Sequence, residues 1–415
     1  MGSMRLFRTM SAALIVIILV TAALAACSSP GATPAGAYKW PAGITIGTPG
    51  VTSAAYAAMA AWTSEMEKAS GMKVRLSPED NTSLQNRWLG QGQIDLQDQN
   101  ETTTADIISA NPNRPEYQVR DGGPYQIRRV AMRQPTYFSY FAAGDSGIKT
   151  FKDIKKGTRI SLFTNSPDWV GALLAMLQYT DKDVQLVPFA AYASSVQAVT
   201  QGKTDVAVVA PSAATAFEAE SGPRGAVWLS LPTEKEDPEA VKRFRSVWSV
   251  PIGPITSGVK SAIGKNCVVL FGGLWGTTAM ADDLAYNIVK WQAENYNLFK
   301  DKTSETPGIS LENLRWYLDQ TMLPTHNGTI KYMKDRGMWK PADDDRQKYN
   351  EWRLGQYIAA YKAAIADADK QGIAVAPENA KWRDLWKDYV TTKYKLQPFV
   401  IMGDAEIKAG LANIK

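Results

Sequence analysis

The chain has 415 residues, of which 45% are hydrophobic, with 46 lysines and arginines against 41 aspartates and glutamates. A net charge of +5, spread evenly along the chain, is too small to indicate nucleic-acid binding. The single histidine, His326, and the two cysteines exclude zinc sites built on H-E-x-x-H or on paired Cys and His, and no G-x-S-x-G motif marks a nucleophile. We therefore expect no enzyme, no metal and no cofactor.

The beginning of the chain resembles a bacterial lipoprotein signal. Two arginines precede an apolar run at residues 12–23, and the sequence LAAC ends at Cys27. We expect residues 1–27 to be a signal peptide, with a lipid on Cys27 that anchors the exported chain to the membrane, in the periplasm or at the cell surface. An uncleaved membrane anchor is the alternative, but it needs about 20 apolar residues. Residues 28–41 have the composition of a flexible tether.

The rest of the chain alternates between strand and helix patterns. Expected strands lie at residues 43–47, 72–76, 94–99, 158–163 and 205–210, with a long extended segment at 127–143. Expected helices run over residues 53–70, through Leu84 and Trp88, and onward from Ser166, which suits an N-cap. Such βαβ units have right-handed crossovers, so the pattern predicts an α/β fold with mostly parallel sheets. The remaining cysteine, Cys267, lies in the apolar run CVVLF and is expected to be buried.

Three strand ends turn directly into helix starts, at Thr48 to Ser53, Thr164 to Ser166 and Ala210 to Ser212. Ligands bind outside the carboxyl ends of parallel strands, and the N–H groups of a helix start favour an anion. The first turn, GTPGVTS, lacks the lysine of a P-loop. Two interpretations of it remain open, an ordinary strand-to-helix connection and an anion site.

Three further segments resemble substrate-binding proteins. GDSGIKTFKDIKKGTRIS (144–161) is similar to their crossover into a second lobe, and QAVTQGKTDVAVVAP (197–211) to their "dGkiDA" strand. LPTHNGTIKYMKDRGMW (323–339) resembles the closing motif of the TAXI solute receptors of TRAP transporters. Together with ITIGTPG near the start, the resemblance covers about residues 43–339.

The resemblance implies a two-lobe periplasmic-binding-protein-like fold of type II, in which each lobe is a mostly parallel sheet flanked by helices. The expected domains are the signal and tether already named, lobe 1 at 42–143 plus 251–340, lobe 2 at 144–250, and a helical C-terminal extension at 341–415. We expect the extension to pack against lobe 1, because its apolar residues fall on helix faces. The histidine of the closing motif is expected to be structural.

The resemblance also implies a receptor that captures a small organic anion between its lobes by hinge closure and delivers it to a TRAP-type membrane transporter. A carboxylate, a dicarboxylate or an amino acid such as glutamate is the expected ligand. In lobe 1 the implied ligand-binding residues are Thr48, Val51, Thr52, Ser53, Tyr56, Gln99 and Asn100. In lobe 2 the corresponding turn departs from the family's glycine-rich pattern, and the hydrogen-bond donors there are Thr164, Asn165, Ser166 and Ser212.

Positive charge for the anion has four candidates, Arg87, Arg129, Arg133 and Arg159, each of which would ordinarily lie at the surface. Arg133 is favoured because it lies in the segment that crosses between the lobes. Asp168, near the lobe 2 turn, would repel a second carboxylate unless it faces away. The alternative functions are a receptor for an ABC importer or a sensor kinase, and a surface lipoprotein with no role in transport.

Overall fold

The computed structural model describes residues 38–414, apart from residues 52, 80, 164–166 and 190–191. The signal segment with Cys27, most of the tether, and the expected site residues Thr52, Thr164, Asn165 and Ser166 lie outside the described residues. None of the helices in the described part of the chain has the length and apolar character that crossing a membrane requires.

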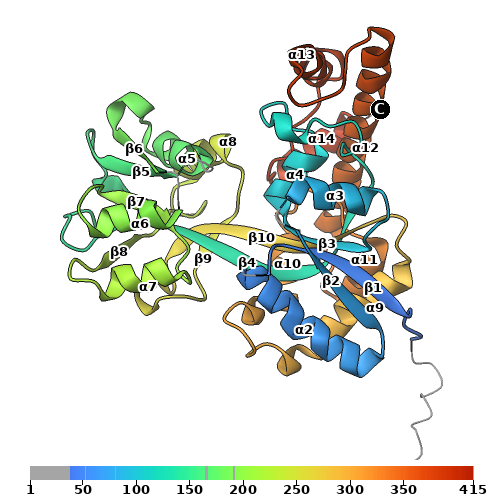
Figure 1. Cartoon of the computed structure of the whole chain (residues 1–415), viewed down its shortest axis with the longest axis horizontal. Helices are drawn as coiled ribbons and strands as arrows, with labels where there is room; N and C mark the ends of the chain where they lie inside the picture. Colours follow the sequence, from blue (N-terminus) through green and yellow to red (C-terminus); the bar gives the residue numbers. More distant parts are fainter. Residues whose placement is uncertain (1–37, 52, 80, 164–166, 190–191, 415) are drawn as a thin grey trace, which may run out of the picture. The chain divides into compact units, whose positions relative to one another are not determined.

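In the part of the chain that the structure describes, ten strands and the helices that flank them make up the two lobes (Figure 1). The strands are β1 (Gly43–Thr48), β2 (Lys73–Pro78), β3 (Leu96–Asn100), β4 (Ile127–Ala143), β5 (Arg159–Phe163), β6 (Gln185–Phe189), β7 (Val206–Val209), β8 (Ala226–Leu229), β9 (Ile252–Pro254) and β10 (Asn266–Thr277). Helices of lobe 1 are α2 (Ala54–Ser70), α3 (Thr82–Gly90), α4 (Glu101–Ile108), α9 (Asp282–Glu294), α10 (Leu311–Leu318) and α11 (Asn327–Asp335). Those of lobe 2 are α5 (Pro167–Leu177), α6 (Tyr192–Thr200), α7 (Ala214–Ser221) and α8 (Pro238–Val247).

The strand order β2-β1-β3-β10-β4-β7-β5-β6 joins the two lobes through their crossing strands. The strands of the βαβ units pair in parallel, β1 with β2 and β3 in one lobe, and β5 with β6 and β7 in the other. The crossing strands β4 and β10 instead run antiparallel to each other and to β3 and β7. Figure 1 shows β4 and β10 leading from one lobe to the other. The expected parallel pairing therefore holds for the strands of the βαβ units, while the strands that cross between the lobes pair antiparallel.

The closing motif of the sequence is packed tightly against the core of lobe 1. The N–H of His326 donates to the carbonyl of Arg129 in β4, and the His326 Nδ1 accepts a hydrogen bond from the Gly328 N–H at 3.2 Å, which caps α11. Burial lowers the pKa of His326, so the ring is neutral in this role. Gly328 is buried against α9, where a Cβ would lie 2.0 Å from the carbonyl oxygen of Asp282. The structural role expected for His326 agrees with these contacts.

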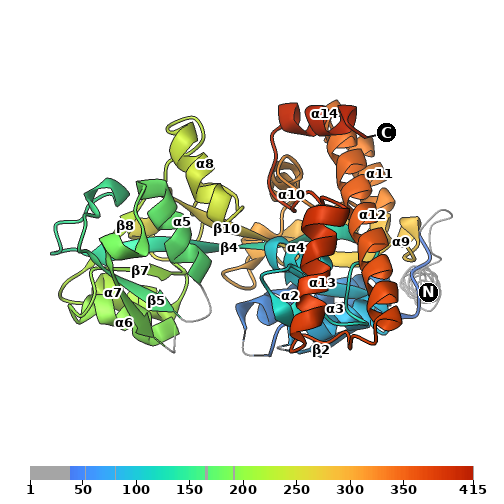
Figure 2. The ribbon, with the colours of Figure 1, turned by 90° about the horizontal axis from the view of Figure 1, so that it is seen from above.

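The C-terminal extension forms α12 (Pro341–Lys370), α13 (Ala380–Asp388) and α14 (Asp404–Ala412). It packs against lobe 1 (Figure 2), as expected from its apolar faces. The indole N–H groups of Trp382 and Trp386 donate to the carbonyls of Gln118 and Ala110, at 3.0 and 2.7 Å. Since both indoles are fully buried, the extension shares a core with the rest of the chain.

Cys267 begins the buried part of β10, as expected. Its thiol is fully buried, and burial raises its pKa far above the ordinary value for cysteine. A thiol in this state is a poor nucleophile, so Cys267 acts as a small apolar residue of the core.

Candidate ligand-binding site

The turn between β1 and α2 is the first expected ligand-binding segment. Ser53 is the N-cap of α2, and its Oγ accepts a hydrogen bond from the N–H of Tyr56 at 3.1 Å. Thr48 is fully buried at the end of β1, whereas Val51 is 60% exposed and Tyr56 is half-buried. Among the described residues, the Thr48 hydroxyl has no hydrogen-bond partner. A buried hydroxyl without a partner costs free energy.

The carboxyl end of β3 lies beside this turn, because β1 and β3 pair in parallel. Asp98 Oδ1 lies 2.5 Å from the Nε of Arg133, and Asn100 Oδ1 accepts a hydrogen bond from the Arg133 Nη1 at 3.0 Å. Gln99 Oε1 accepts from the backbone N–H of Asn100 at 2.7 Å. Within the described part of the chain, the buried Gln97 Oε1 is also without a hydrogen-bond partner. Arg133 thus contacts Asp98 and Asn100, while the side chain of Gln99 bonds to the backbone of Asn100.

Two adjacent glycines of β10 make room for two arginines of β4. A Cβ on Gly272 would lie 2.3 Å from the Cδ of Arg133, and a Cβ on Gly273 would lie 2.3 Å from the Nη1 of Arg129. Successive residues of a strand face opposite sides of the sheet, so the two guanidinium groups lie on opposite faces. The pair Gly272-Gly273 within an apolar strand is a sequence signal for this arrangement, and the sequence analysis did not use it.

Arg129 is a structural residue of the core. Its side chain is fully buried, and its guanidinium carbon lies 4.2 Å from the ring centre of Trp275 and 4.0 Å from that of Tyr317. Its Nη2 is 3.6 Å from Glu101 Oε2. Arginine side chains ordinarily lie at the surface, and this expectation is wrong for Arg129 and for Arg133, which is 6% exposed. Both are buried because the sheet provides carboxylates beside them and glycines that leave room for their side chains.

Two acids with raised pKa values lie beside Arg133. Burial raises the pKa of Asp98 to about 6, although Arg133 opposes that rise. Burial likewise raises the pKa of Glu305, against the effects of Arg133 and of a hydrogen bond from Ser212. Ser212 is exposed and lies after β7 in lobe 2, so its bond to Glu305 links the two lobes beside Arg133. Protonation of one acid makes the group neutral, and protonation of both leaves the charge of Arg133 for an anionic ligand.

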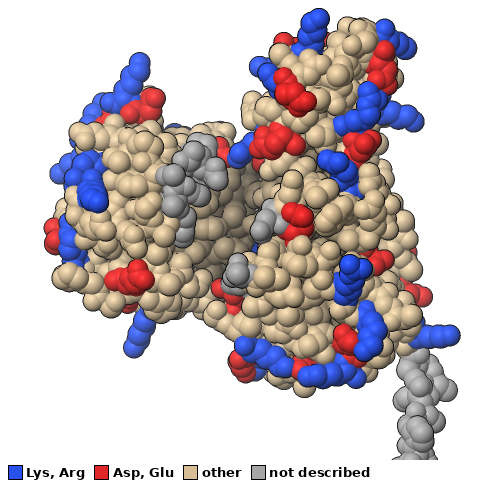
Figure 3. Space-filling view, viewed as in Figure 1, with Lys and Arg blue, Asp and Glu red and all other residues tan. Residues whose placement is uncertain are grey.

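The first turn of α5 in lobe 2 contacts lobe 1 through Asp168. The Asp168 Oδ2 accepts a hydrogen bond from the Arg114 Nη2 at 3.1 Å, so a cation of lobe 1 offsets its charge. From the sequence, Asp168 is expected to repel a second carboxylate unless it faces away, and its pairing with Arg114 reduces that repulsion. On the face shown in Figure 3, the surface is hollowed between the two lobes.

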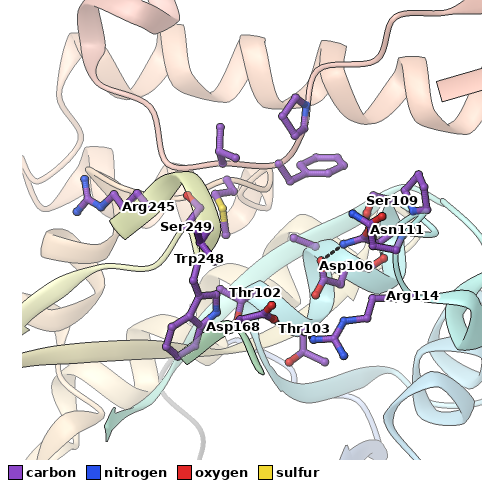
Figure 4. A pocket seen from close by; sticks show the side chains of 18 of the residues that line it. Thr102, Thr103, Asp106, Ser109, Asn111, Arg114, Asp168, Arg245, Trp248 and Ser249 are labelled. Carbon is purple, nitrogen blue, oxygen red and sulfur yellow. Dashed lines mark hydrogen bonds and ion pairs between the residues drawn. The ribbon is translucent and has the colours of Figure 1, made fainter. Parts of the chain in front are cut away.

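A cavity of about 540 Å³ lies beside α4, and we call it the α4 cavity. Its walls come from α4 and the loop after it, from α5, from the end of α8, and from the C-terminal extension (Figure 4). Of the expected site residues, none lines it; Asp168 does. The sequence analysis missed the α4 cavity because helix α4 was not predicted and because residues from four separate segments form its walls.

We expect Thr48→Val to separate ligand binding from folding. Valine has the shape of threonine but lacks the unpartnered hydroxyl, so the ligand-free protein should be as stable as the wild type or more stable by about 1 kcal/mol. Affinity for the ligand should fall about tenfold, since the ligand loses a hydrogen-bond partner. Urea unfolding and calorimetric titration measure the two effects. Unchanged affinity would remove Thr48 from the site.

Comparison with solved structures finds similar proteins at low identity. The periplasmic sulfonate-binding protein SsuA of an ABC transporter from Methylobacillus flagellatus is 16% identical over 87% of this chain and 97% of its own, with a TM-score of 0.36. A lipoprotein of the YaeC family from Enterococcus faecalis is 13% identical over 65% of this chain and 98% of its own, with a TM-score of 0.40. The alkanesulfonate-binding SsuA from Xanthomonas axonopodis pv. citri, bound to MOPS, is 16% identical over 83% and 98%, with a TM-score of 0.34.

No curated protein matches the chain. A protein-family model does, over residues 46–337, which is more than half of the sequence. The matched range begins in β1 and ends just after α11, so it includes both lobes and the closing motif but not the C-terminal extension. The chain belongs to the NMT1-like family.

Proposed function

We propose that the protein is an exported solute-binding receptor that holds a small organic anion between its two lobes. One observation carries the proposal: a buried hydroxyl without a partner among the described residues, Thr48 Oγ1, lies at the end of β1, next to the strand whose Asp98 and Asn100 contact Arg133. Helix-start N–H groups, a free hydroxyl and an arginine are together the donors that a carboxylate needs.

In this proposal, lobe 1 binds the ligand through Thr48, Thr52, Ser53, Asn100 and Arg133. Lobe 2 completes the site through Thr164, Asn165, Ser166 and Ser212. Hinge closure at the crossing strands then brings both sets of donors onto one ligand, and the ligand favours the closed population because it contacts both lobes only there. The role is binding rather than catalysis.

We expect anion affinity to rise as the pH falls from about 8 to about 5.5, through the pKa of Asp98. A bound anion disfavours the ionised Asp98 carboxylate, so binding is coupled to proton uptake, and affinity is greatest when Asp98 is protonated. The expected change is about fivefold, with 2-oxoglutarate as the probe. Asp98→Asn mimics the protonated acid, so this variant should bind the anion at every pH about as tightly as the wild type does at low pH. Any remaining dependence of its affinity on pH should come from Glu305. Calorimetric titration at several pH values measures this, and a rising affinity with pH would contradict it.

We further propose that the receptor is anchored by a lipid on Cys27 and delivers its ligand to a TRAP-type membrane transporter. The resemblance of residues 323–339 to the TAXI closing motif supports this partner. Uptake into proteoliposomes that hold a TRAP transporter tests it: addition of the receptor should produce uptake driven by an ion gradient and independent of ATP. Uptake that requires an ABC transporter and ATP instead would overturn the choice of partner, but not the receptor function.

Calorimetric titration of carboxylates tests the binding function itself. The chain from Ser28 onward should bind at least one member of a panel of mono- and dicarboxylates and acidic amino acids with micromolar affinity or better. A panel that includes neutral and cationic solutes separates the anion proposal from general solute binding. Binding only to cations or to neutral solutes would overturn the ligand class.

A further inference from the structure

The α4 cavity is lined by none of the residues proposed to hold the anion. One wall is formed by α4 and its following loop, with Thr102, Thr103, Asp106 and Arg114, and the other by Asp168, Trp169 and residues 245–249 of lobe 2 (Figure 4). Its volume of about 540 Å³ falls within the usual range for sites that bind small molecules.

The roof of the cavity comes from the C-terminal extension, outside the range that the family model matches. Residues 396–400 line the cavity together with Tyr357 and Val390. This roof is held firmly: the guanidinium of Arg353 donates to the carbonyl of Pro398 at 2.7 Å, and the ring centres of Tyr357 and Phe399 lie 4.9 Å apart. The extension therefore adds a fixed wall to the fold shared by the family.

The backbone beside this roof also bonds to lobe 2. The N–H of Ile401 donates to the Oγ of Ser249 at 2.8 Å, and Ser249 lines the cavity at the end of the α8 segment. Hydrogen bonds and a ring contact thus hold the roof of the cavity and join it to Ser249 of lobe 2. Such preorganised walls reduce the entropy that a ligand site must lose on binding.

The charges of the cavity leave one carboxylate without an ionic partner. Arg114 pairs with Asp168 at 3.1 Å, and Arg245 pairs with Glu234 outside the cavity. Asp106 Oδ1 accepts a hydrogen bond from the Asn111 Nδ2 at 2.7 Å, but among the described residues Asp106 has no cation within ion-pair distance. Burial raises the pKa of Asp106, although the hydrogen bond from Asn111 and the charge of Arg114 oppose that rise. A cationic ligand would relieve this cost.

Aromatic rings line the side opposite α4. The rings of Trp169 and Trp248 are stacked, with centres 5.9 Å apart and an angle of 23° between their planes. Aromatic faces attract cations, and more strongly where water is excluded. The guanidinium of Arg353 lies over the ring of Phe399 and donates to the carbonyls of Pro398 and Met322. These contacts stabilise its positive charge.

We propose that the α4 cavity binds a small organic cation, an ammonium group on a flat apolar body, with the ammonium at Asp106 and the apolar body against Trp169 and Trp248. The site does not depend on the proposed anion-receptor function, since none of the residues that the two sites use is shared. The cation has one of two roles: it is transported together with the anion as a second solute, or its binding changes the affinity of the receptor for the anion. Both roles require that the cation binds in the α4 cavity.

Two probes of nearly the same shape and opposite charge test the proposal. Phenethylamine, as its ammonium ion, and 3-phenylpropionate are titrated at about pH 8 into the chain from Ser28 onward, with calorimetry and tryptophan fluorescence as readouts. The expected result is saturable binding of phenethylamine, at least about tenfold tighter than 3-phenylpropionate. Equal binding of the two probes, tighter binding of the anion, or no binding of the cation would overturn the proposal.

Variants place the cation in the cavity. Asp106→Asn preserves the shape and the acceptor for Asn111, and it should weaken phenethylamine binding about tenfold. Trp248→Leu keeps an apolar wall without the ring face and should weaken it about fivefold. Asp301→Asn removes an exposed acid that does not line the cavity, and it should bind as the wild type does. Thr48→Val should also leave phenethylamine binding unchanged, which separates this site from the anion site. Wild-type binding in Asp106→Asn would overturn the assignment even if Trp248→Leu failed to fold.

Discussion

Arg133→Met is expected to lower the affinity for a carboxylate ligand at least about 100-fold. Arg133 is the cation of the proposed site, and the two acids beside it, Asp98 and Glu305, both have raised pKa values, so proton uptake by these acids leaves its charge for the ligand. Methionine fills much of the same space over Gly272 but has neither charge nor donors. Calorimetric titration with the best ligand of the carboxylate panel measures the loss.

The same substitution also affects folding, because it leaves Asp98 buried without its partner. We expect the free energy of unfolding at neutral pH to fall by about 3 kcal/mol, as is usual when one member of a buried ion pair is removed. The double variant Asp98→Asn with Arg133→Met has neither charge, so it should regain most of that stability and still fail to bind. Wild-type affinity in the stable double variant would contradict the role given to Arg133.

Gly328→Ala is expected to lower the free energy of unfolding by about 3 kcal/mol. A Cβ at this position would lie 2.0 Å from the carbonyl oxygen of Asp282 and 2.7 Å from the backbone nitrogen of Tyr286. Both are backbone atoms of α9 or its first turn, so they cannot move aside as a flexible side chain could, and α11 must shift away from α9. Urea unfolding followed by circular dichroism measures the change.

Gly355→Ala is the matched control for that experiment. Gly355 lies inside α12, and a Cβ there would meet no atom within 4 Å. Alanine favours a helix interior more than glycine does, so this variant should be more stable by about 0.5 to 1 kcal/mol. If Gly328→Ala were as stable as Gly355→Ala, the close approach of α9 and α11 would not be the reason for glycine in the closing motif.

Much of the fold could be predicted from the sequence, because local signals and tertiary packing agree there. The segment Ile127–Ala143 forms one strand over its whole expected length. The helix expected to end at Gly71 does so, with the left-handed φ of 74° that glycine permits. Helix α4 was not expected, since its polar start, ETTT, has no periodic apolar pattern. Its formation depends on burial of Glu101 against Thr321 and the backbone of residues 322 and 323.

The candidate site could be predicted only in part. The position of Ser53 follows from a helix start, which the sequence marks with a capping residue, whereas Asn100 followed only from the family resemblance. The pairing of Arg133 with Asp98 joins two strands that are not adjacent in the sheet, and it depends on Gly272 in the strand between them. The α4 cavity depends on how the C-terminal extension meets lobe 2 near Ser249, and no local pattern encodes such a long-range contact.

Native mass spectrometry of the chain from Ser28 onward, purified without added ligand, tests the central claim most directly. The account predicts that a single small acid is retained, that it is released on unfolding, and that the Thr48→Val variant and the double variant of Asp98 and Arg133 retain less of it. A protein that carries no acid is then titrated with the carboxylate panel, where the account predicts binding that raises the melting temperature. A ligand-free mass together with no thermal shift from any carboxylate would contradict the proposed receptor function.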